Sequence, residues 1–287
     1  MKTIIITGGC GQLGESCNKY LKKDFNIIIT GRDAYKSGIK LDITDKNDIA
    51  KAYRNFKPDV VLNLAAMTDV DGCEKDKIAA KKINFESVKY LCENFSGHFI
   101  QLSTDYVFDG NSGPYNELDD VNPISYYGKT KLDAENWLKD NYSNSTILRA
   151  NVIYSYTKRT KASFVKWVVD SLKNNKEINV VNDQWNNPTW TESIALVIKN
   201  IIDSGLNGLY NYGDKDFMTR YDFAILISRV FNLDESLIKP TSTSSLNQIA
   251  NRPLKSGLIT KKIESSLGIV PNSVENCLRE IYNNLSK

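Results

Sequence analysis

The fold is decided by residues 2–14, which read Lys-Thr-Ile-Ile-Ile-Thr-Gly-Gly-Cys-Gly-Gln-Leu-Gly. The short β-branched run at residues 2–7 predicts a strand that is buried on both faces of a parallel sheet. After the glycines, apolar residues recur at helical spacing at Leu13, Cys17 and Leu21. A strand, a glycine-rich turn and a helix in this order predict the first half of a dinucleotide-binding unit.

The three glycines of this turn have separate tasks. Gly8 lets the chain turn sharply, Gly11 lets the backbone approach a pyrophosphate, and Gly14 lets the helix pack on the strand. The helix N-terminus then offers free N–H groups and the positive end of its dipole to the phosphates. The position of this pattern between a strand and a helix therefore favours a dinucleotide site.

Further apolar runs follow the same alternation. Strands are expected at residues 26–30, 59–64, 98–102 and in a run that ends at Leu148, with helical periodicity between them, as over 74–95. This order predicts an α/β fold with a Rossmann-type doubly wound parallel sheet. We expect residues 1–150 to form the NAD(P)-binding domain. Residues 151–287, where the alternation weakens, are expected to form mainly a smaller substrate-binding lobe, and its C-terminal segments are free to return to the first domain.

Candidate ligand contacts follow the strands, because such sheets bind ligands outside the carboxyl ends of their strands. Arg32 follows the second strand and can pair with a 2′-phosphate, which favours NADPH over NADH; an exposed loop arginine is the alternative. Small residues at Ala65–Met67 would let a cofactor lie across the third strand. Asp42 is placed to accept from an adenine amino group, and Asp45 is placed to cap the next helix.

Tyr127 and Lys131 lie four residues apart at the expected start of a helix, so their side chains leave one face of it. A neighbouring ammonium lowers the pKa of a phenol from about 10. Tyr127 could then exchange a proton with a carbinol oxygen near neutral pH, with Thr104 as a second hydrogen-bond donor. Such a Tyr/Lys pair also arises by chance, and its position after the strand ends is what favours a catalytic pair.

Composition excludes several classes of protein. No apolar run approaches the length of a membrane span, and the basic residues form no arm, so neither a membrane nor a nucleic acid is expected as a partner. Five cysteines without a Cys-x-x-Cys pair predict reduced thiols in the cytoplasm. The only histidine, His98, begins a strand and is expected to be structural. No histidine-based triad and no metal site are therefore expected.

Four stretches carry a resemblance to a known family. They are Gly8-x-x-Gly11-Gln12-Leu13-Gly14, Ala65-Ala66-Met67-Thr68-x-Val70-Asp71, Ser103-Thr104-Asp105-Tyr106-Val107-Phe108-Asp109-Gly110 and Tyr127-Gly128-x-Thr130-Lys131, with weaker echoes at 148–149, 183–189 and 252–253. The whole chain resembles the extended short-chain dehydrogenase/reductases, and within them the dTDP-4-dehydrorhamnose reductase family. The resemblance implies NAD(P)H-dependent reduction of the 4-keto group of a nucleotide-linked 6-deoxyhexulose, foremost dTDP-4-dehydro-L-rhamnose, for cell-surface polysaccharide precursors.

The resemblance also implies the roles of individual residues. Tyr127 would protonate the new alkoxide, Lys131 would lower the pKa of Tyr127 and hold the nicotinamide ribose, and Thr104 would orient the carbonyl. The implied substrate-binding residues are Thr104, Asp105, Tyr106, Asn151, Val152, Trp185 and Arg252. The implied cofactor-binding residues are Gly8, Gly11, Gln12, Leu13, Gly14, Arg32, Asp42, Ile43, Ala65, Ala66, Met67, Asn84, Tyr127 and Lys131, with NADPH as the expected cofactor and NADH as the alternative.

The sequence departs from relatives at three places. Sugar-nucleotide dehydratases place a glutamate after Thr-Asp as a second acid, whereas this chain has Tyr106, which disfavours elimination. The reductase family usually has a sugar-stacking tryptophan where this chain has Val152, so the stacking surface is lost or comes from Trp185 or Trp190. Met67 replaces a common tyrosine, which is a tolerable apolar exchange.

Two other functions stay open at this point. One is a reductase or epimerase-reductase that acts on another nucleotide sugar. The other is a non-catalytic dinucleotide-binding regulatory subunit resembling methionine adenosyltransferase β, against which the presence of Thr104, Tyr127 and Lys131 argues. The sequence does not fix the assembly, and a homodimer is one candidate.

Overall fold

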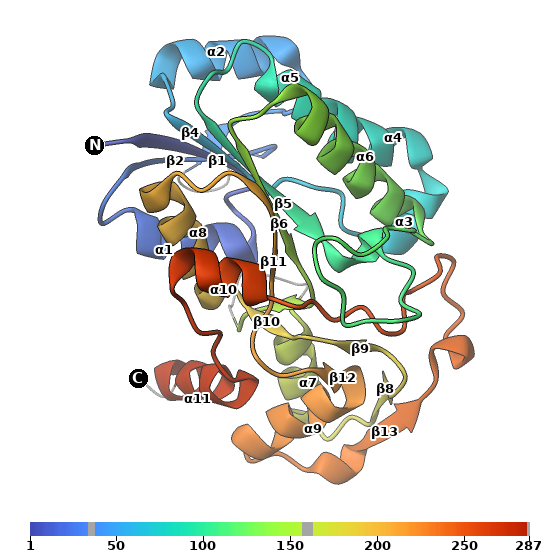
Figure 1. Cartoon of the computed structure of the whole chain (residues 1–287). Helices are drawn as coiled ribbons and strands as arrows, with labels where there is room; N and C mark the ends of the chain where they lie inside the picture. Colours follow the sequence, from blue (N-terminus) through green and yellow to red (C-terminus); the bar gives the residue numbers. More distant parts are fainter. Residues whose placement is uncertain (34–37, 157–162, 286–287) are drawn as a thin grey trace.

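A computed structural model describes residues 1–33, 38–156 and 163–285 of the chain. Its centre is a parallel sheet of seven strands in the order β11-β6-β5-β4-β1-β2-β3 (Figure 1). The strands are β1 (Thr3–Thr7), β2 (Asn26–Gly31), β3 (Ile39–Lys40), β4 (Val60–Asn63), β5 (His98–Thr104), β6 (Ser145–Ala150) and β11 (Gly208–Tyr212). The chain order reverses between β1 and β4, which creates the crevice where such sheets bind ligands. The predicted α/β class and doubly wound sheet are confirmed.

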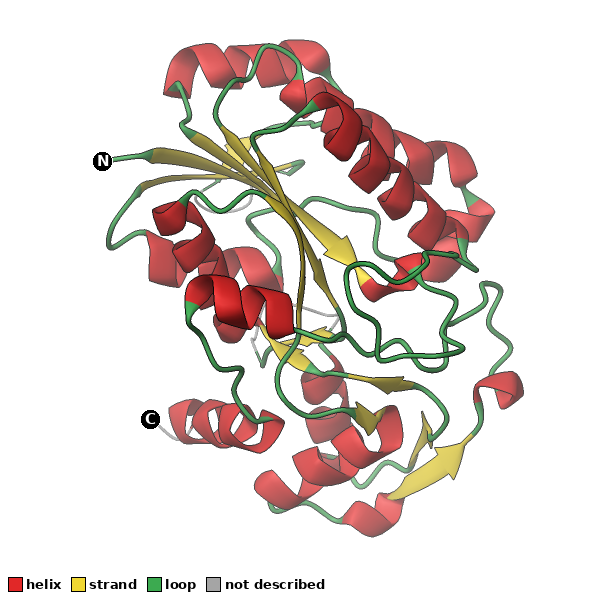
Figure 2. Ribbon diagram, viewed as in Figure 1, coloured by secondary structure: helices red, strands yellow, loops and turns green. Residues whose placement is uncertain are grey.

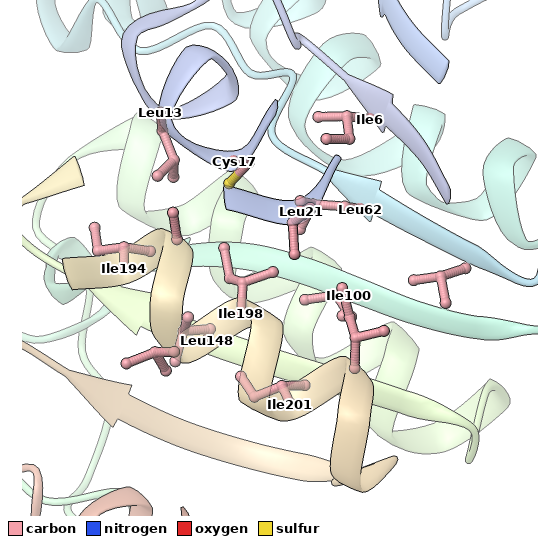
Figure 3. Packing of buried hydrophobic residues seen from close by; sticks show 14 of the residues in the cluster. Ile6, Leu13, Cys17, Leu21, Leu62, Ile100, Leu148, Ile194, Ile198 and Ile201 are labelled. Atoms are coloured by element: carbon pink, nitrogen blue, oxygen red, sulfur yellow. The ribbon is translucent and has the colours of Figure 1, made fainter. Parts of the chain in front are cut away.

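Helices cover both faces of this sheet (Figure 2). One face carries α1 (Gln12–Leu21), α8 (Thr191–Ser204) and α10 (Lys261–Leu267); the other carries α2 (Lys46–Phe56), α3 (Val70–Lys75), α4 (Lys77–Lys81), the π-helix η1 (Lys82–Glu86), α5 (Ser87–Cys92) and α6 (Tyr126–Asn141). The three isoleucines of β1 show why the strand forms. Ile4 and Ile6 enter the core on the α1 side, Ile5 enters the opposite core, and all three are fully buried. Figure 3 shows the first of these cores, where Cys17 and Leu21 of α1 meet Ile198 of α8 above the sheet.

The remaining chain forms a smaller lobe with its own core. It contains α7 (Phe164–Lys173), α9 (Arg220–Val230), α11 (Val274–Leu285) and the paired strands β8 (Ile178–Val181) and β13 (Ile238–Thr241). Short 3-10 turns lie directly before β13, at Glu235–Leu237, and after it, at Thr243–Ser245. Two short ladders complete it, β7 (Ile153–Tyr154) with β10 (Thr189–Trp190) and β9 (Trp185–Asn186) with β12 (Met218–Thr219). Segments α8, β11 and α10 of the C-terminal half lie on the large sheet (Figure 1).

Two local features differ from or refine the expectations. The helical stretch expected over 74–95 is divided into four segments. Asp76 separates α3 from α4 and caps α4 by accepting from the Ala79 amide, and the π-helical turn η1 carries Asn84, which accepts from the Met67 amide in the loop after β4. Asp45 caps α2 as predicted, accepting a hydrogen bond from the Asn47 amide. Within the ranges that the structure describes, no helix has the length and apolar character needed to cross a bilayer.

Candidate active site

The catalytic candidates meet where β5 ends and α6 begins. Thr104 is the last residue of β5, and the 3-10 turn η2 (Asp105–Val107) follows it directly. Ser125 caps α6 by accepting from the Gly128 amide. A Cβ at Gly128 would lie 2.1 Å from the carbonyl oxygen of Tyr106, so only glycine lets α6 approach η2 this closely. This contact brings Tyr127 beside the end of β5.

Tyr127 is half-buried and lies next to Thr104. Burial raises the pKa of Tyr127 above its ordinary value, and a hydrogen bond with the Thr104 side chain opposes that rise. The predicted lowering of this pKa by Lys131 is therefore wrong in the structure, because desolvation outweighs every favourable contact. A phenol that keeps its proton is a donor, and this state suits protonation of an alkoxide.

Lys131 lies one turn further along α6 and is 4% exposed. Its Nζ donates to the Leu102 carbonyl oxygen at 2.6 Å, which directs the ammonium to the edge of β5. Burial lowers the pKa of Lys131 to about 8, while the Glu135 carboxylate acts in the opposite direction. The ammonium is thus held by the backbone of the strand that ends in Thr104.

Asp105 is a buried carboxyl at the same point. Its Oδ2 accepts from the Ser256 hydroxyl at 2.5 Å and its Oδ1 accepts from the Thr104 hydroxyl at 3.1 Å. Burial raises the pKa of Asp105 to about 6, and these two hydrogen bonds oppose the rise.

Tyr106 packs edge-to-face on Tyr127 with ring centroids 5.6 Å apart, and burial also raises the pKa of Tyr106. Tyr106 therefore offers no second acid near neutral pH, as its replacement of a glutamate predicted.

A pocket of about 260 Å³ adjoins these residues between the two lobes. It is lined by Tyr106, Phe164, Trp167, Asn179, Val180, Val181, Gln184, Arg220, Leu246, Gln248 and Arg252. Arg252 is held by Asp71, with Nη2 and Oδ1 3.0 Å apart. The Arg220 guanidinium lies over the Phe164 ring at 5.4 Å, and its buried Nε has no hydrogen-bond partner among the residues that the structure describes. The pocket thus combines two guanidinium groups with aromatic and amide side chains, a combination suited to a phosphorylated ligand.

The other predicted substrate residues lie in different surroundings. Asn151 donates to the Ser256 carbonyl oxygen at 3.2 Å, and within the described part of the chain its buried Oδ1 has no hydrogen-bond partner. Val152 has a φ of 42°, an uncommon conformation for a β-branched residue. Trp190 is 6% exposed within the core of the small lobe, so it has no free face for a sugar. Trp185 is only partly buried and lies beside Phe217, which leaves it as the remaining candidate for that role.

The glycine turn before α1 has the geometry of a phosphate cradle. Gly8 has a φ of 62°, and a Cβ there would lie 2.8 Å from the backbone of Ala65. A Cβ at Gly14 would lie 2.3 Å from the Gly9 carbonyl oxygen, whereas one at Gly11 meets only a 3.3 Å contact. Among the described residues no side chain caps the first turn of α1, so its amides remain available for an anion. These residues fit a bound dinucleotide pyrophosphate.

The remaining cofactor candidates are placed around this turn. Arg32 is exposed after β2, and the side chains of Leu13 and Ile43 lie in the cores, so only their backbones can face a ligand. Asp42 accepts from the Thr44 amide and hydroxyl, both at 2.8 Å, and these bonds lower the pKa of Asp42. Asp42 thus stabilises its own turn, and its predicted adenine contact would have to share these oxygens.

Two amide side chains of the predicted set hold backbone segments. Asn84 accepts from the Met67 amide at 2.8 Å and donates to Thr130 of α6, which fixes the loop with Ala65 and Ala66 after β4. The Gln12 amide donates to the Ile153 carbonyl oxygen at 3.2 Å. Gln12 thereby links the glycine turn to the chain that enters the small lobe.

Sequence reasoning missed Arg220, Ser256 and two aromatic residues that line the pocket, Phe164 and Trp167. None belongs to a motif with Thr104 or Tyr127, and Ser256 reaches Asp105 across 151 positions of sequence. A lone arginine at the start of α9 gives no local signal that distinguishes a ligand contact from a surface charge. These residues become visible only when the two lobes are in place.

The sheet and the placement of Thr104, Tyr127 and Lys131 at its carboxyl edge define a short-chain dehydrogenase/reductase. The family model described as the RmlD substrate binding domain matches residues 1–287. The chain belongs to this family, which confirms the resemblance noted from its motifs to the dTDP-4-dehydrorhamnose reductases.

Individual relatives agree with this membership. The chain is 33% identical to a dTDP-4-dehydrorhamnose reductase of Aggregatibacter actinomycetemcomitans, with 98% of each chain covered. A crystal structure of a dTDP-4-dehydrorhamnose reductase from Clostridium acetobutylicum superposes with a TM-score of 0.90 at 35% identity, covering 99% of this chain and 100% of that one. A dTDP-4-dehydrorhamnose reductase from Bacillus anthracis in complex with NADP gives a TM-score of 0.90 at 26% identity, covering 99% of both chains. Methionine adenosyltransferase 2 subunit beta of Danio rerio is 28% identical, with 97% of this chain and 90% of the relative covered.

Proposed function

We propose that this chain is an NADPH-dependent oxidoreductase that reduces the 4-keto group of dTDP-4-dehydro-L-rhamnose to give dTDP-L-rhamnose, a precursor of cell-surface polysaccharide. The observation that carries the proposal is the contact of Thr104 with Tyr127 at the end of β5, beside a pocket with two arginines. Family membership over the whole chain supports the same reaction.

NADPH, when bound, supplies a hydride to C4 of the sugar. Backbone amides at Gly11–Gly14 hold its pyrophosphate, and Arg32 pairs with its 2′-phosphate. The backbone at Ala65–Met67, fixed by Asn84, forms the surface across which the dinucleotide lies. Lys131 holds the nicotinamide ribose from the edge of β5.

The proton and the charge are handled by two side chains. Thr104 donates to the carbonyl oxygen of the substrate and orients it. Tyr127, which burial keeps protonated, gives its proton to the oxygen as charge develops there. Donors aimed at such an oxygen typically contribute a few kcal/mol each.

The nucleotide part of the substrate lies in the pocket between the lobes. Arg220 and Arg252 hold the diphosphate, since paired guanidinium groups match phosphate oxygens. Asp105, Tyr106, Asn151, Val152 and Trp185 surround the sugar in this proposal. Of these, Asp105 is already engaged with Ser256 and Thr104, so its contact with a sugar hydroxyl is made in competition with them.

The test follows the absorbance of NADPH, and then of NADH, with enzymatically prepared dTDP-4-dehydro-L-rhamnose. We expect Tyr127→Phe to lower turnover at least 100-fold, because the proton donor is removed. Tyr126→Phe is the matched control, since Tyr126 is the preceding residue of the same helix. Tight dinucleotide binding without turnover would instead favour a regulatory subunit, and turnover only with another 4-keto nucleotide sugar would favour a different reductase.

We place the reaction in the cytoplasm, in keeping with five cysteines that are all free thiols.

The homodimer considered from the sequence is tested by sedimentation of the purified chain with and without NADPH. A monomer under both conditions would exclude it.

A further inference from the structure

Helix α3 carries two carboxylates that hold two different parts of the active site. Asp71 and Glu74 are three residues apart on this helix, and side chains at that spacing are neighbours on a helix surface. Their partners lie far away in sequence: the partner of Glu74 is 52 residues away, and one partner of Asp71 is 179 residues away. The proposed reaction gives neither side chain a task.

Asp71 fixes a segment that lines the pocket between the lobes. We call residues 246–252 the strap, because three of them, Arg252 included, line that pocket. Oδ1 of Asp71 accepts from the Ala250 amide and from Nη2 of Arg252, both at 3.0 Å. Nη1 of Arg252 donates to the Ala250 carbonyl oxygen at 3.3 Å. A guanidinium has five N–H donors, so these two bonds are compatible with further bonds to phosphate oxygens.

Glu74 fixes the first residue of the helix that carries the proton donor. Its Oε1 accepts from the Tyr126 amide at 2.7 Å, and Tyr126 begins α6 directly before Tyr127. The first amides of a helix have no partner within it, and Ser125 satisfies a different one, that of Gly128. A carboxylate at this end also interacts favourably with the helix dipole. Glu74 thereby sets the position of the Tyr127 backbone relative to α3.

A third contact joins α3 to the loop after β4. The Cys73 side chain is fully buried, and its thiol donates to the Met67 carbonyl oxygen at 3.4 Å. Met67 belongs to the stretch across which the dinucleotide is proposed to lie, and Asn84 holds the same residue independently. Helix α3, which lies beside α6 in Figure 1, thus contacts the cofactor loop, the strap and the catalytic helix.

We propose that α3 is a positioning element of the active site, in which Asp71 sets the affinity for the substrate diphosphate by holding Arg252 and the strap, and Glu74 sets the rate of the chemical step by holding the start of α6. The inference rests on the proposed function and deepens it. The two roles separate in kinetics, because lost substrate binding raises KM, whereas a misplaced proton donor lowers kcat.

The first experiment measures the Kd of dTDP by titration calorimetry, together with KM and kcat for the sugar nucleotide. We expect Asp71→Ala to raise both Kd and KM by about tenfold and to leave kcat within about twofold of the wild type. Asp71→Asn should have a smaller effect, since its amide oxygen still accepts from both donors although the charge is lost. The Kd of NADPH should stay unchanged in both variants. Lys75→Ala, at an exposed position of the same helix, is the control.

A double-variant cycle tests whether Asp71 acts through Arg252. In an Arg252→Ala background, Asp71→Ala should change the Kd of dTDP by less than about threefold, because the guanidinium that it holds is gone. Fully additive effects would overturn the role of Asp71. A wild-type Kd in Asp71→Ala would overturn it as well.

Glu74→Ala tests the second half of the proposal. We expect kcat to fall by about tenfold, with KM and the Kd of dTDP little changed, since a shift of α6 misplaces the proton donor. Glu74→Gln should recover most of the rate, because its amide oxygen can accept from the Tyr126 amide. A purely stabilising role would lower the unfolding temperature of Glu74→Ala and leave kcat as in the wild type. That result, or equal losses of kcat in both variants, would overturn the role of Glu74.

Calorimetry separates this inference from the proposed function, because it needs no turnover. If Asp71→Ala weakens dTDP binding but the wild type reduces no 4-keto nucleotide sugar, the assigned reaction fails and the role of Asp71 stands. If the wild type reduces the sugar but Asp71→Ala keeps the wild-type KM, the role of Asp71 fails and the reaction stands. A wild type that binds no dTDP would overturn both.

Discussion

Gly128 shows how one residue positions the catalytic phenol. A Cβ at this position would lie 2.1 Å from the Tyr106 carbonyl oxygen, so Gly128→Ala must push α6 away from η2. Because a displacement of about 1 Å in a catalytic group can cost about 100-fold in rate, we expect kcat to fall by about that factor. Steady-state kinetics with NADPH check this, and Lys129→Ala, an exposed neighbour, should retain the wild-type rate. A Gly128→Ala enzyme of wild-type activity would show that the close contact is dispensable.

Among single residues, the sequence predicted those catalytic candidates that belong to short motifs. Thr104, Tyr127 and Lys131 could be selected because each sits in a short motif next to a strand end or helix start. The upward shift of the Tyr127 pKa could not be predicted from the sequence, because it depends on burial by residues from several elements. Ser256 and Arg220 were missed for the same reason: their contacts with η2 exist only in three dimensions.

At the scale of elements, a buried ion pair ties α6 to the sheet. Glu135 of α6 and Arg149 of β6 are both fully buried, with Nη2 and Oε2 2.6 Å apart, and Ser103 of β5 donates to Glu135 Oε1 at 2.5 Å. The pair therefore holds the helix that carries Tyr127 and Lys131 against the strands that carry Thr104.

We expect Glu135→Gln to lower the free energy of unfolding by roughly 3–5 kcal/mol, because it leaves the Arg149 charge buried without a counter-charge. Urea unfolding followed by circular dichroism measures the change. Lys139→Ala serves as the control, since Lys139 is 42% exposed and 3.9 Å from Glu135, and should change stability by less than about 1 kcal/mol. Removing both partners in Glu135→Leu/Arg149→Met should recover part of the loss, and a double variant less stable than Glu135→Gln would contradict this account.

The elements themselves were largely predictable. Buried parallel strands such as β1 and β4 are short β-branched runs, and strands were therefore expected at residues 2–7 and 59–64. The interruption of the helix by η1 was not predictable, because the contact that accompanies it, from the Met67 amide to Asn84, joins two separate segments of the chain. The positive φ of Val152 was equally hidden, since nothing in its local sequence indicates it.

For the whole molecule, Asp214 joins the two cores. It accepts from the Trp190 amide at 2.8 Å and from the Tyr212 hydroxyl at 3.3 Å, and the Cys277 thiol of α11 lies 3.7 Å away. Tyr212 belongs to the core of the large sheet, whereas Trp190 and Cys277 belong to that of the small lobe. Burial raises the pKa of Asp214 to about 6 from its usual 3.8.

A pKa that is higher in the folded state means that the folded chain binds more protons than the unfolded chain between these values. The contribution of Asp214 to stability is therefore present below about pH 4 and is lost as pH rises to about 6. The loss lowers the free energy of unfolding by at most about 3 kcal/mol. The amide in Asp214→Asn does not titrate, so only the wild type loses stability from this group as pH rises. We therefore expect the free energy of unfolding of Asp214→Asn, relative to that of the wild type, to increase between pH 4 and pH 6. Urea titrations at pH 4, 5, 6 and 7 measure it, with the surface change Asp203→Asn as the control. A constant difference between Asp214→Asn and wild type would contradict the raised pKa.

The division at residue 150 remains a proposal about domains, yet the return of later segments is visible in the topology. Strand β11 pairs with β6, and α8 covers the same face as α1. Sequence periodicity could not assign β11 and α8 to the large sheet, because parallel pairing leaves no trace in the spacing of either strand.

That return has a consequence for synthesis on the ribosome. When the first 150 residues have emerged, the nascent chain has six of its seven strands, an open edge on β6 and an isoleucine-rich face that awaits α8. Edges and faces of this kind attract other chains. Until Tyr212, the last residue of β11, has emerged, this edge and face stay uncovered. We expect the nascent chain to depend during that period on chaperones that cover apolar surface.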